Sequence, residues 1–220
     1  MIYRWLFYIL GMLILALGLT LNTKTGLGVS PIISVSFAVS QIWGFNFGDA
    51  TFVLYILCVA GEIALQRRRN LISNLLQILV SLVFSRVLNV YDALITYDNT
   101  LHSLPENLLM LAAAMICTGV GAALSVNAHL AANPGDGIVA AIGEAIGKEQ
   151  GVAKNIVDIS CVVFTCILSF LAVGRVVGIG LGTLCAMICV GRVISFFNKR
   201  WKVSMLRLSG LEPPMEVTAA

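Results

Sequence analysis

The residue of this sequence best suited to chemistry is Asp136, which lies in the segment Asn-Pro-Gly-Asp-Gly at positions 133–137. Proline favours the first position of a helix, so Pro134 makes Asp136 the third residue of a short helix. A carboxylate held there could bind a coupling proton, a cation or the amine of a substrate. It could equally balance the positive N-terminal end of its own helix, as acidic residues in a first turn commonly do. Asp136 is therefore a candidate for substrate binding, with helix capping as the alternative.

A second Gly/Pro segment earlier in the chain has the same form. Ser30 and Asn133 are residue types that favour the N-cap, and a proline follows each of them. The glycines Gly28 and Gly135 allow the backbone to come close to a ligand. A helix N-terminus holds about half a positive charge and binds anions and polar oxygens through its free N–H groups. We expect these four residues to form part of a substrate site; two ordinary interfacial helices with good caps are the alternative.

Two asparagines and two arginines are further candidates. Asn22 and Asn127 each stand at the end of a long apolar run. They could line the same site, or they could cap the helix that they end. Arg86 and Arg192 lie inside apolar runs, where an ionisable residue is a functional hypothesis by default because an unpaired charge is costly. We expect them to gate or support the site; the alternative is that their long side chains reach the lipid headgroups.

Motifs of enzymes and of metal sites are missing from the sequence. It has no P-loop, no G-x-S-x-G and no H-E-x-x-H, and its two histidines are His102 and His129. All six cysteines fall within apolar runs, where an unpaired cysteine acts as a small apolar residue. We therefore expect a protein that is not an enzyme, with no catalytic residue, no cofactor and no bound metal.

The elements that carry these residues follow from the composition. Of the 220 residues, 59% are hydrophobic and 11% are charged, and the mean hydropathy is +0.94. A soluble domain is about 45–50% apolar and about 25% charged, so this chain has too little polar surface for a water-soluble fold.

Six apolar runs are long enough to cross a hydrocarbon core of about 30 Å, which takes roughly 17–25 helical residues. These runs are Trp5–Leu21, Ala50–Gln66, Leu71–Tyr91, Asn107–Val126, Asn155–Val173 and Val177–Phe197. Two further runs, Pro31–Trp43 and Pro134–Gly147, are too short to span a bilayer as helices. We predict an all-α membrane protein with six transmembrane helices and two short helices.

An internal repeat organises these runs. The residue matches are Leu19–Asn22 with Leu124–Asn127, Gly28–Pro31 with Ala131–Pro134, Gly48 with Gly151, Cys58 with Cys161, and Arg86 with Arg192. The offset is 103 from Pro31 to Pro134 and 106 from Arg86 to Arg192. Each half then reads as a long helix, a Gly/Pro loop, a short helix and two long helices. Chance similarity between leucine-rich helices is the alternative to this duplication.

Each half contains three full spans, an odd number, so the second half enters the membrane in the opposite direction to the first. Inverted repeats with broken helices recur in transporters, where the substrate binds near the midplane at the repeat interface. The first repeat covers residues 1–95, with its short helix at 31–43. The second covers residues 107–197, with its short helix at 134–147. We expect both short helices to be re-entrant, and irregular chain at that depth must be buried in protein or line a wet cavity.

Charge placement predicts the orientation. If each long run crosses once, ten of the 14 basic residues fall on one side: Arg4, Arg67, Arg68, Arg69, Lys148, Lys154, Lys199, Arg200, Lys202 and Arg207. The positive-inside rule makes that side cytoplasmic, together with both termini and the tail at 198–220. The loop at 96–106 contains Asp98 and Glu106 and no basic residue, and is expected outside. The net charge of +3 is thus an orientation signal and does not indicate a nucleic-acid partner.

The Gly/Pro loop after the first span, its counterpart at 133–137 and the segment Gly-Ile-Gly-Leu-Gly-Thr at 178–183 together resemble the YczE/YyaS/YitT family of bacterial integral membrane proteins. The resemblance covers roughly residues 5–197. Because the chain lacks the C-terminal soluble domain of the YitT branch, it is most similar to the YczE branch. The resemblance implies this fold and a bacterial plasma-membrane location. It implies no activity and no catalytic residues, because members of the family are largely uncharacterised.

These observations favour a small secondary transporter that moves a small polar or anionic solute through a midplane site at the repeat interface. One alternative is a channel-like or lipid-handling protein with a groove open to lipid. Another is a non-transporting membrane partner of a second protein, which would have no polar cavity. The expected partners are a small-molecule or ion substrate and the lipid bilayer, and not nucleic acid. Association into a homodimer stays open.

Overall fold

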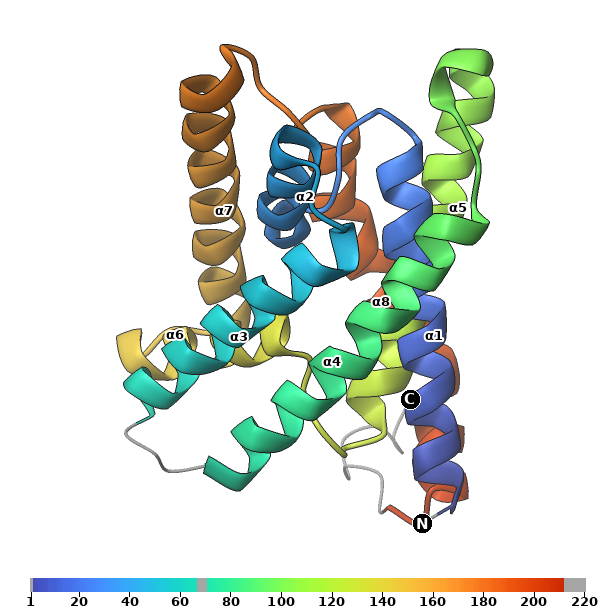
Figure 1. The fold of residues 1–220 in the computed structure, drawn as a ribbon. Helices are drawn as coiled ribbons and strands as arrows, with labels where there is room; N and C mark the ends of the chain where they lie inside the picture. Colours follow the sequence, from blue (N-terminus) through green and yellow to red (C-terminus); the bar gives the residue numbers. More distant parts are fainter. Residues whose placement is uncertain (1, 67–70, 212–220) are drawn as a thin grey trace.

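A computed structural model describes residues 2–66 and 71–211 of the chain. This described part is all-helical, with eight α-helices, one short 3-10 turn and no strand (Figure 1). The prediction of an all-α fold is confirmed. The helices are α1 (Ile2–Lys24), α2 (Pro31–Trp43), α3 (Phe47–Leu65), α4 (Leu71–Leu94), α5 (Leu104–Asn127), α6 (Pro134–Ile146), α7 (Gln150–Val173) and α8 (Leu181–Leu208), and the 3-10 turn η1 (Asn99–Leu101) precedes α5.

Six of these helices have the length and apolar composition of membrane spans, which confirms the predicted number. They are α1, α3, α4, α5, α7 and α8. At about 1.5 Å of rise per residue, even the shortest, α3 with its 19 residues, approaches the thickness of a hydrocarbon core. The protein is therefore a multi-pass membrane protein.

The last helix differs from its predicted bounds, Val177–Phe197. Gly174 ends α7 with φ +69°, and Gly178 also has a left-handed φ of +79°, so the chain between them cannot be helical. Helix α8 starts only at Leu181, and it continues to Leu208, through residues that the sequence assigns to a tail. The apolar run at 177–197 did not reveal this shift, because helix bounds depend on backbone conformation at glycine more than on hydropathy.

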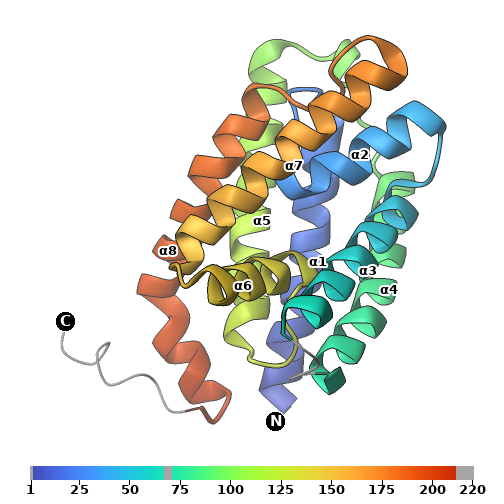
Figure 2. The same cartoon turned by 90° about the vertical axis from the view of Figure 1, so that its left-hand side faces the viewer.

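Helices α1 and α5 form a closely packed pair along one side of the molecule, on the right of Figure 1 and at the back of Figure 2. Small residues allow the backbones to approach, as they do in membrane helix pairs generally. A side chain at Gly18 would come within 2.5 Å of the Thr118 backbone nitrogen, and one at Gly121 within 2.3 Å of the Leu15 nitrogen. These two glycines fix the crossing of α1 and α5.

The two short helices begin inside the molecule. The loop after α1 descends to the start of α2, and the loop after α5 rises to the start of α6 (Figure 1). Both helices end at a left-handed glycine, Gly44 with φ 73° and Gly147 with φ 63°, a common C-terminal signal. The first of these loops is held by backbone hydrogen bonds to the start of α8: Val29 N donates to Gly178 O at 2.9 Å, and Gly182 N donates to Leu27 O at 2.7 Å.

Helix contacts in the two halves correspond. Helix α2 packs on α7 and α3 packs on α6; α1 packs on α4 and α5 packs on α8; α2 packs on α3 and α6 packs on α7. Replacing each of α1–α4 by its counterpart among α5–α8 turns every one of these contacts into another observed contact. One contact has no counterpart: α3 packs along α4, but α7 makes no comparable contact with α8.

Candidate functional site

A central cavity of about 840 Å³ lies where the two halves meet. Its walls come from the starts of α2 and α6, from α7 and α8, and from the chain that follows α5. Ligand cavities generally measure about 300–1,000 Å³, so this one has room for a small solute and its water. Residues 129–132, which follow α5, line it together with residues between 186 and 198 of α8, so the cavity extends toward the end of the molecule where both ends of the described chain lie (Figure 1).

The start of α2 presents an uncompensated positive end to the central cavity. Ser30 and Pro31 line the cavity, and the Ser30 side chain makes no capping hydrogen bond. The first turn of α2 contains no acidic residue. The backbone N–H groups of that turn and their partial positive charge are therefore free to attract an oxygen of a ligand.

The start of α6, by contrast, is compensated by its own side chains. Asn133 is buried, and its side-chain oxygen accepts a hydrogen bond of 2.9 Å from Gly135 N. Asp136 lies in the first turn and lines the central cavity together with Gly137. The carboxylate of Asp136 thus lies where it can both balance the helix and meet a solute.

Helix α7 adds a second charged wall. Lys154 Nζ lies 3.2 Å from Asp158 Oδ2, and the two side chains are one helical turn apart. Both residues line the central cavity, and they are the charges that act on Asp136. Together with Asp136 on α6, the lining of the cavity has two carboxylates and one ammonium group, a net charge of −1 when all three are ionised.

The two predicted asparagines Asn22 and Asn127 do not line the central cavity. Asn127 is buried and donates a hydrogen bond of 2.6 Å to Asn198, which does line the cavity. Asn22 is buried at the end of α1, where its backbone carbonyl oxygen accepts a hydrogen bond from the Thr25 hydroxyl at 2.8 Å. Asn22 therefore acts in the turn that ends α1.

The two predicted glycines serve backbone packing. A side chain at Gly28 would come within 2.5 Å of the Gly180 nitrogen, and φ at Gly28 is +106°. Gly135 has more room, because its nearest neighbour would be the flexible end of Ile32 at 3.0 Å. Gly28 is thus required by the loop that seats the start of α2 against the start of α8.

The arginines do not line the central cavity. Arg86 Nη2 lies 2.8 Å from Asp49 Oδ1, and this half-exposed ion pair joins α3 to α4. Arg192 is exposed on α8 and has no ion-pair partner among the described residues. The contact made by Arg86 therefore belongs to the α3–α4 packing that has no counterpart between α7 and α8.

Sequence reasoning did not assign Lys154, Asp158, His129 and Asn198 to the site. The spacing of Lys154 and Asp158 predicts an ion pair, which the structure contains, and a charged pair inside an apolar run was the signal that could have placed them in a cavity. Asn198 gave no such signal, because it stands next to the basic residues that follow the last apolar run.

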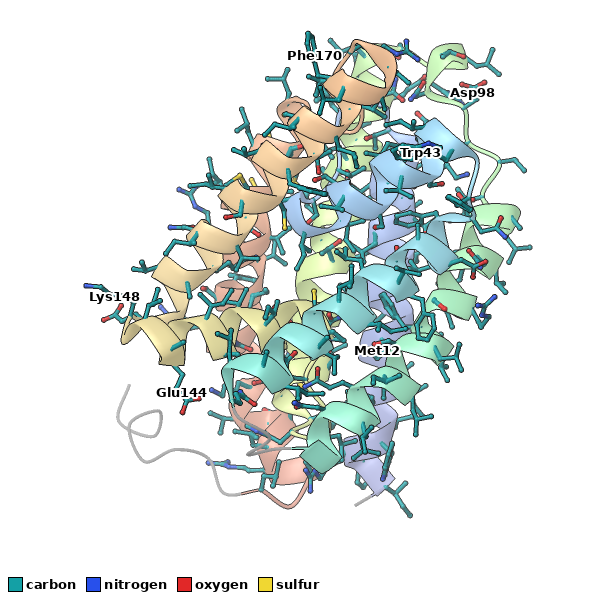
Figure 3. The ribbon with its side chains drawn as sticks, turned by 60° about the vertical axis from the view of Figure 1, so that its left-hand side comes forward. Met12, Trp43, Asp98, Glu144, Lys148 and Phe170 are labelled. Atoms are coloured by element: carbon teal, nitrogen blue, oxygen red, sulfur yellow. The ribbon has the colours of Figure 1, made fainter. Side chains whose placement is uncertain are left out.

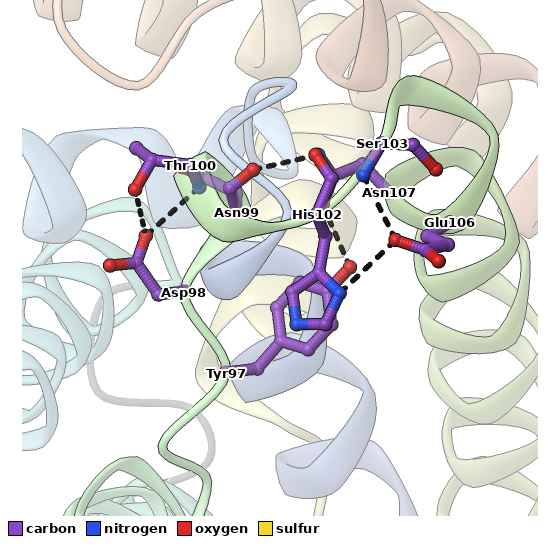
Figure 4. A network of polar contacts seen from close by, with 8 residues as sticks. All are labelled: Tyr97, Asp98, Asn99, Thr100, His102, Ser103, Glu106 and Asn107. Carbon is purple, nitrogen blue, oxygen red and sulfur yellow. Dashed lines mark hydrogen bonds and ion pairs between the residues drawn. The ribbon is translucent and has the colours of Figure 1, made fainter.

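The opposite end of the molecule holds a smaller cavity of about 410 Å³, lined by residues that include Lys24, Gln41, Asp92 and Asn99. The chain beside it is well ordered by hydrogen bonds (Figure 4). The Tyr97 hydroxyl donates to Asn107 Oδ1 at 2.9 Å, and Glu106 accepts from Ser103 N at 2.9 Å at the start of α5. Hydrogen bonds therefore hold the loop at 96–106 beside this smaller cavity.

The fold and cavity define a small multi-pass helical membrane protein with a charged cavity between two short helices. The chain belongs to a family of unknown function, DUF6198, whose model matches residues 2–199. It is 26% identical to the uncharacterized membrane protein YczE of Bacillus subtilis (strain 168), over 89% of this chain and 86% of the relative.

Two further relatives have similar coverage. An uncharacterized protein of Haemophilus influenzae is 28% identical over 84% of this chain and 78% of its own. The uncharacterized protein YyaS of Bacillus subtilis is 23% identical over 87% of this chain and 90% of its own. No solved structure matches the chain. The predicted family resemblance is confirmed.

Proposed function

We propose that this protein is a secondary transporter built from two inverted repeats, with the central cavity as its solute site. The observation that carries the proposal is that the starts of both short helices, at Ser30 and at Asp136, line one charged cavity. Transporters with inverted repeats bind their solutes at such helix breaks, because free N–H groups and polar side chains there replace the water of the solute.

The corresponding contacts of the two halves support a twofold repeat, and the opposite directions of α1 and its counterpart α5 support inversion (Figure 1). Two identical units related by a twofold axis would make each contact in duplicate, and six of the seven main contacts between non-equivalent helices follow that rule. The exception, α3 on α4 without α7 on α8, is what an alternating-access protein shows in one of its two states. The closed helix pair blocks one side, and the separated pair opens the cavity to the other.

Individual contacts indicate what the second state looks like. Gly48 N donates to Asn89 Oδ1 at 2.8 Å and joins α3 to α4. The repeat offsets of 103 and 106 carry these residues to Gly151 and Ser195, which both line the central cavity. In the second state these two residues meet, α7 closes on α8, and the cavity opens to the opposite side.

The wall charges favour a small polar solute that carries a positive group. Asp136 and Asp158 outnumber Lys154, so the cavity repels a simple anion unless a positive group accompanies it. The free start of α2 favours an oxygen or a carboxylate on the same solute. A zwitterion or a polar amine satisfies both ends of the cavity.

The orientation rests on the positive-inside rule. Both ends of the described chain lie at the same end of the molecule (Figure 1). Lys148 lies far from Asp98, which marks the loop expected outside (Figure 3). We infer that the central cavity opens to the cytoplasm, that both termini are cytoplasmic and that the protein lies in the bacterial plasma membrane.

A panel of solutes tests this function. The purified protein in lipid nanodiscs is heated with amino acids, polyamines, sugars and organic acids, and the shift of the melting temperature is measured. A solute that binds the folded state raises the melting temperature. Any solute that does so is then tested for counterflow into proteoliposomes. A zwitterion or amine that stabilises the protein and exchanges across the membrane is expected; stabilisation without exchange would contradict transport.

A lipid-handling protein is a second candidate, because α7 and α8, which both line the cavity, make no extensive contact with each other, and a lipid chain could enter between them. The same assay distinguishes the two. A lipid-handling protein is stabilised by a particular phospholipid in the nanodisc and by no soluble member of the panel.

A further inference from the structure

A buried carboxylate lies directly behind the wall of the central cavity. Glu62 on α3 is 2% exposed, and its partner Gln77 on α4 is 3% exposed. Gln77 Nε2 donates a hydrogen bond of 3.1 Å to Glu62 Oε2. The sequence favours pairing of Glu62 with Arg67–Arg69 at the membrane surface. Those arginines lie outside the described residues. Within the described part, the side chain of Glu62 is hydrogen-bonded to Gln77.

The second oxygen of this carboxylate is one of several polar atoms left without a partner. Glu62 Oε1, Gln77 Oε1 and Gln66 Oε1 are buried with no hydrogen-bond donor among the described residues. One unpartnered oxygen of a buried carboxylate and the two unpartnered amide oxygens of its neighbours are costly in an apolar environment. One positive charge would satisfy the carboxylate, and oxygen is the ligand that hard cations prefer.

Gly137 joins this group to the solute site. A side chain at Gly137 would come within 2.3 Å of Glu62 Oε1, so the carboxylate fills the space that the glycine leaves. The same glycine lines the central cavity. A charge at Glu62 is therefore separated from the cavity by the backbone of α6 alone at this point.

The repeat shows that packing alone does not require a carboxylate here. The offset of 103 carries Gly137 back to Ser34 and Glu62 forward to Thr165. Ser34 Oγ and Thr165 Oγ1 lie 2.8 Å apart and are both fully buried, so the equivalent contact between α2 and α7 is a neutral hydroxyl pair. The first half has a charge where the second half has none.

We propose that Glu62, together with the oxygens of Gln66 and Gln77, binds a single monovalent cation, Na⁺ or a proton. The cation site rests on these contacts. Its use as the coupling ion rests on the proposed transport function: binding neutralises a charge behind Gly137 and so changes the field in the central cavity. Transporters commonly place coupling-ion sites at such helix breaks beside the solute site.

The test measures cation binding without any solute. The melting temperature of the full chain in nanodiscs is recorded in rising NaCl, with N-methyl-D-glucamine chloride keeping the ionic strength constant. It is recorded again in Na⁺-free buffer from pH 8 to pH 5. A saturable rise with Na⁺ that is lost in Glu62→Gln identifies a Na⁺ site. A rise only as the pH falls, lost in the same variant, identifies a proton site.

Matched variants keep the result interpretable. Asp49→Asn removes the other carboxylate of α3, which pairs with Arg86, and is expected to leave the cation response intact. Gln77→Leu is expected to weaken the apparent Na⁺ affinity about tenfold, since it removes one ligand oxygen, and it serves if Glu62→Gln does not fold. The other titratable groups near the site are Cys58 on α3 and Asp136 on α6, next to Gly137; comparison with Glu62→Gln removes their contribution.

Equal responses of wild type, Glu62→Gln and Gln77→Leu would overturn the proposal and would mean that water or a group outside the described residues satisfies these atoms. That outcome leaves the transport proposal untouched, because solute stabilisation is measured separately. Conversely, a Na⁺ response lost in Glu62→Gln in a protein that exchanges no solute would keep the cation site and reject transport.

Discussion

Asp136 is the residue on which the solute site depends most. It lies in the first turn of α6 and lines the central cavity. The charges of Lys154 and Asp158 act on its carboxylate. Its surroundings allow two roles, balancing the helix and binding a positive group of the solute. The two roles differ in what happens when the charge is removed and the shape is kept.

Asp136→Asn makes that change. If Asp136 binds a positive group of the solute, the variant folds and inserts, but the solute that stabilises wild type no longer raises its melting temperature, and concentrative transport is lost. Asparagine still offers a polar group to the start of the helix, so we expect unfolding free energy to fall by only about 0.3–1 kcal/mol. Thermal melts with and without solute give both quantities. A folded variant that binds and transports as wild type would restrict Asp136 to capping.

The residue types of the solute site were predictable from the sequence, and their partners were less so. Proline at a first helical position marks both helix starts in the sequence, and Ser30 and Asp136 at these starts line the central cavity; their part in solute binding stays a prediction. Glu62 was harder to place. Whether a polar residue near a span end turns outward to headgroups or inward to Gly137 depends on the neighbouring helix, and a single run of sequence does not contain that information.

The central element is the crossing of α1 and α5. No side chain separates the two backbones at Gly18, where Thr118 approaches, or at Gly121, where Leu15 approaches. Without a hydrophobic force between helices in lipid, such close contact supplies much of the association energy. Both repeats are anchored on this pair, so its disruption affects the whole protein.

Gly18→Val tests this element. The added side chain would meet the Thr118 backbone at 2.5 Å, which neither helix can relieve without separating. We expect a large loss of folded protein. In size-exclusion chromatography in detergent the monodisperse peak should be lost, and the melting temperature should fall below the range of the assay. Gly191→Ala on α8 is the control, since nothing lies within 4 Å of a side chain there, and it should match wild type. A stable Gly18→Val protein would show that the crossing is more open than described.

Most element bounds followed from apolar runs and Gly/Pro signals, down to the first and last residues of α2. The late start of α8 did not, because it depends on left-handed backbone at Gly174 and Gly178. The separation of α7 from α8 could not be predicted either. A sequence repeat predicts the contacts that the two halves share. The contact between α3 and α4 without one between α7 and α8 is a difference between the halves, and the repeat does not predict it.

At the scale of the whole molecule, orientation is open to direct measurement. In a background without the six native cysteines, a single cysteine is introduced at Ser103, before α5, or at Ser204, near the end of α8. The positive-inside rule predicts that a membrane-impermeant maleimide labels the first in intact cells and the second only in inverted vesicles. Labelling of both from one side would contradict the three crossings that separate them in this topology and, with them, the inverted repeat.

Alternating access requires that the two halves exchange conformations around the central cavity. Cysteine cross-linking in membranes tests this most directly, with one pair at Asp49 and Asn89 and a second pair at Gly151 and Ser195, each in the background without native cysteines. The first pair joins α3 and α4, which are already in contact there through a hydrogen bond of 3.2 Å from Asn89 Nδ2 to Asp49 Oδ1. The second pair lies in the wall of the cavity and meets only after α7 closes on α8.

We predict that both pairs cross-link with a short bifunctional thiol reagent. The Gly151/Ser195 cross-link should also protect a cavity residue such as Ala140 from water-soluble reagents on the cytoplasmic side, which can be measured with an accessible probe introduced there. Cross-linking of the Asp49/Asn89 pair alone, with the Gly151/Ser195 pair unreactive at all times and with every solute, would describe a fixed groove and contradict alternating access.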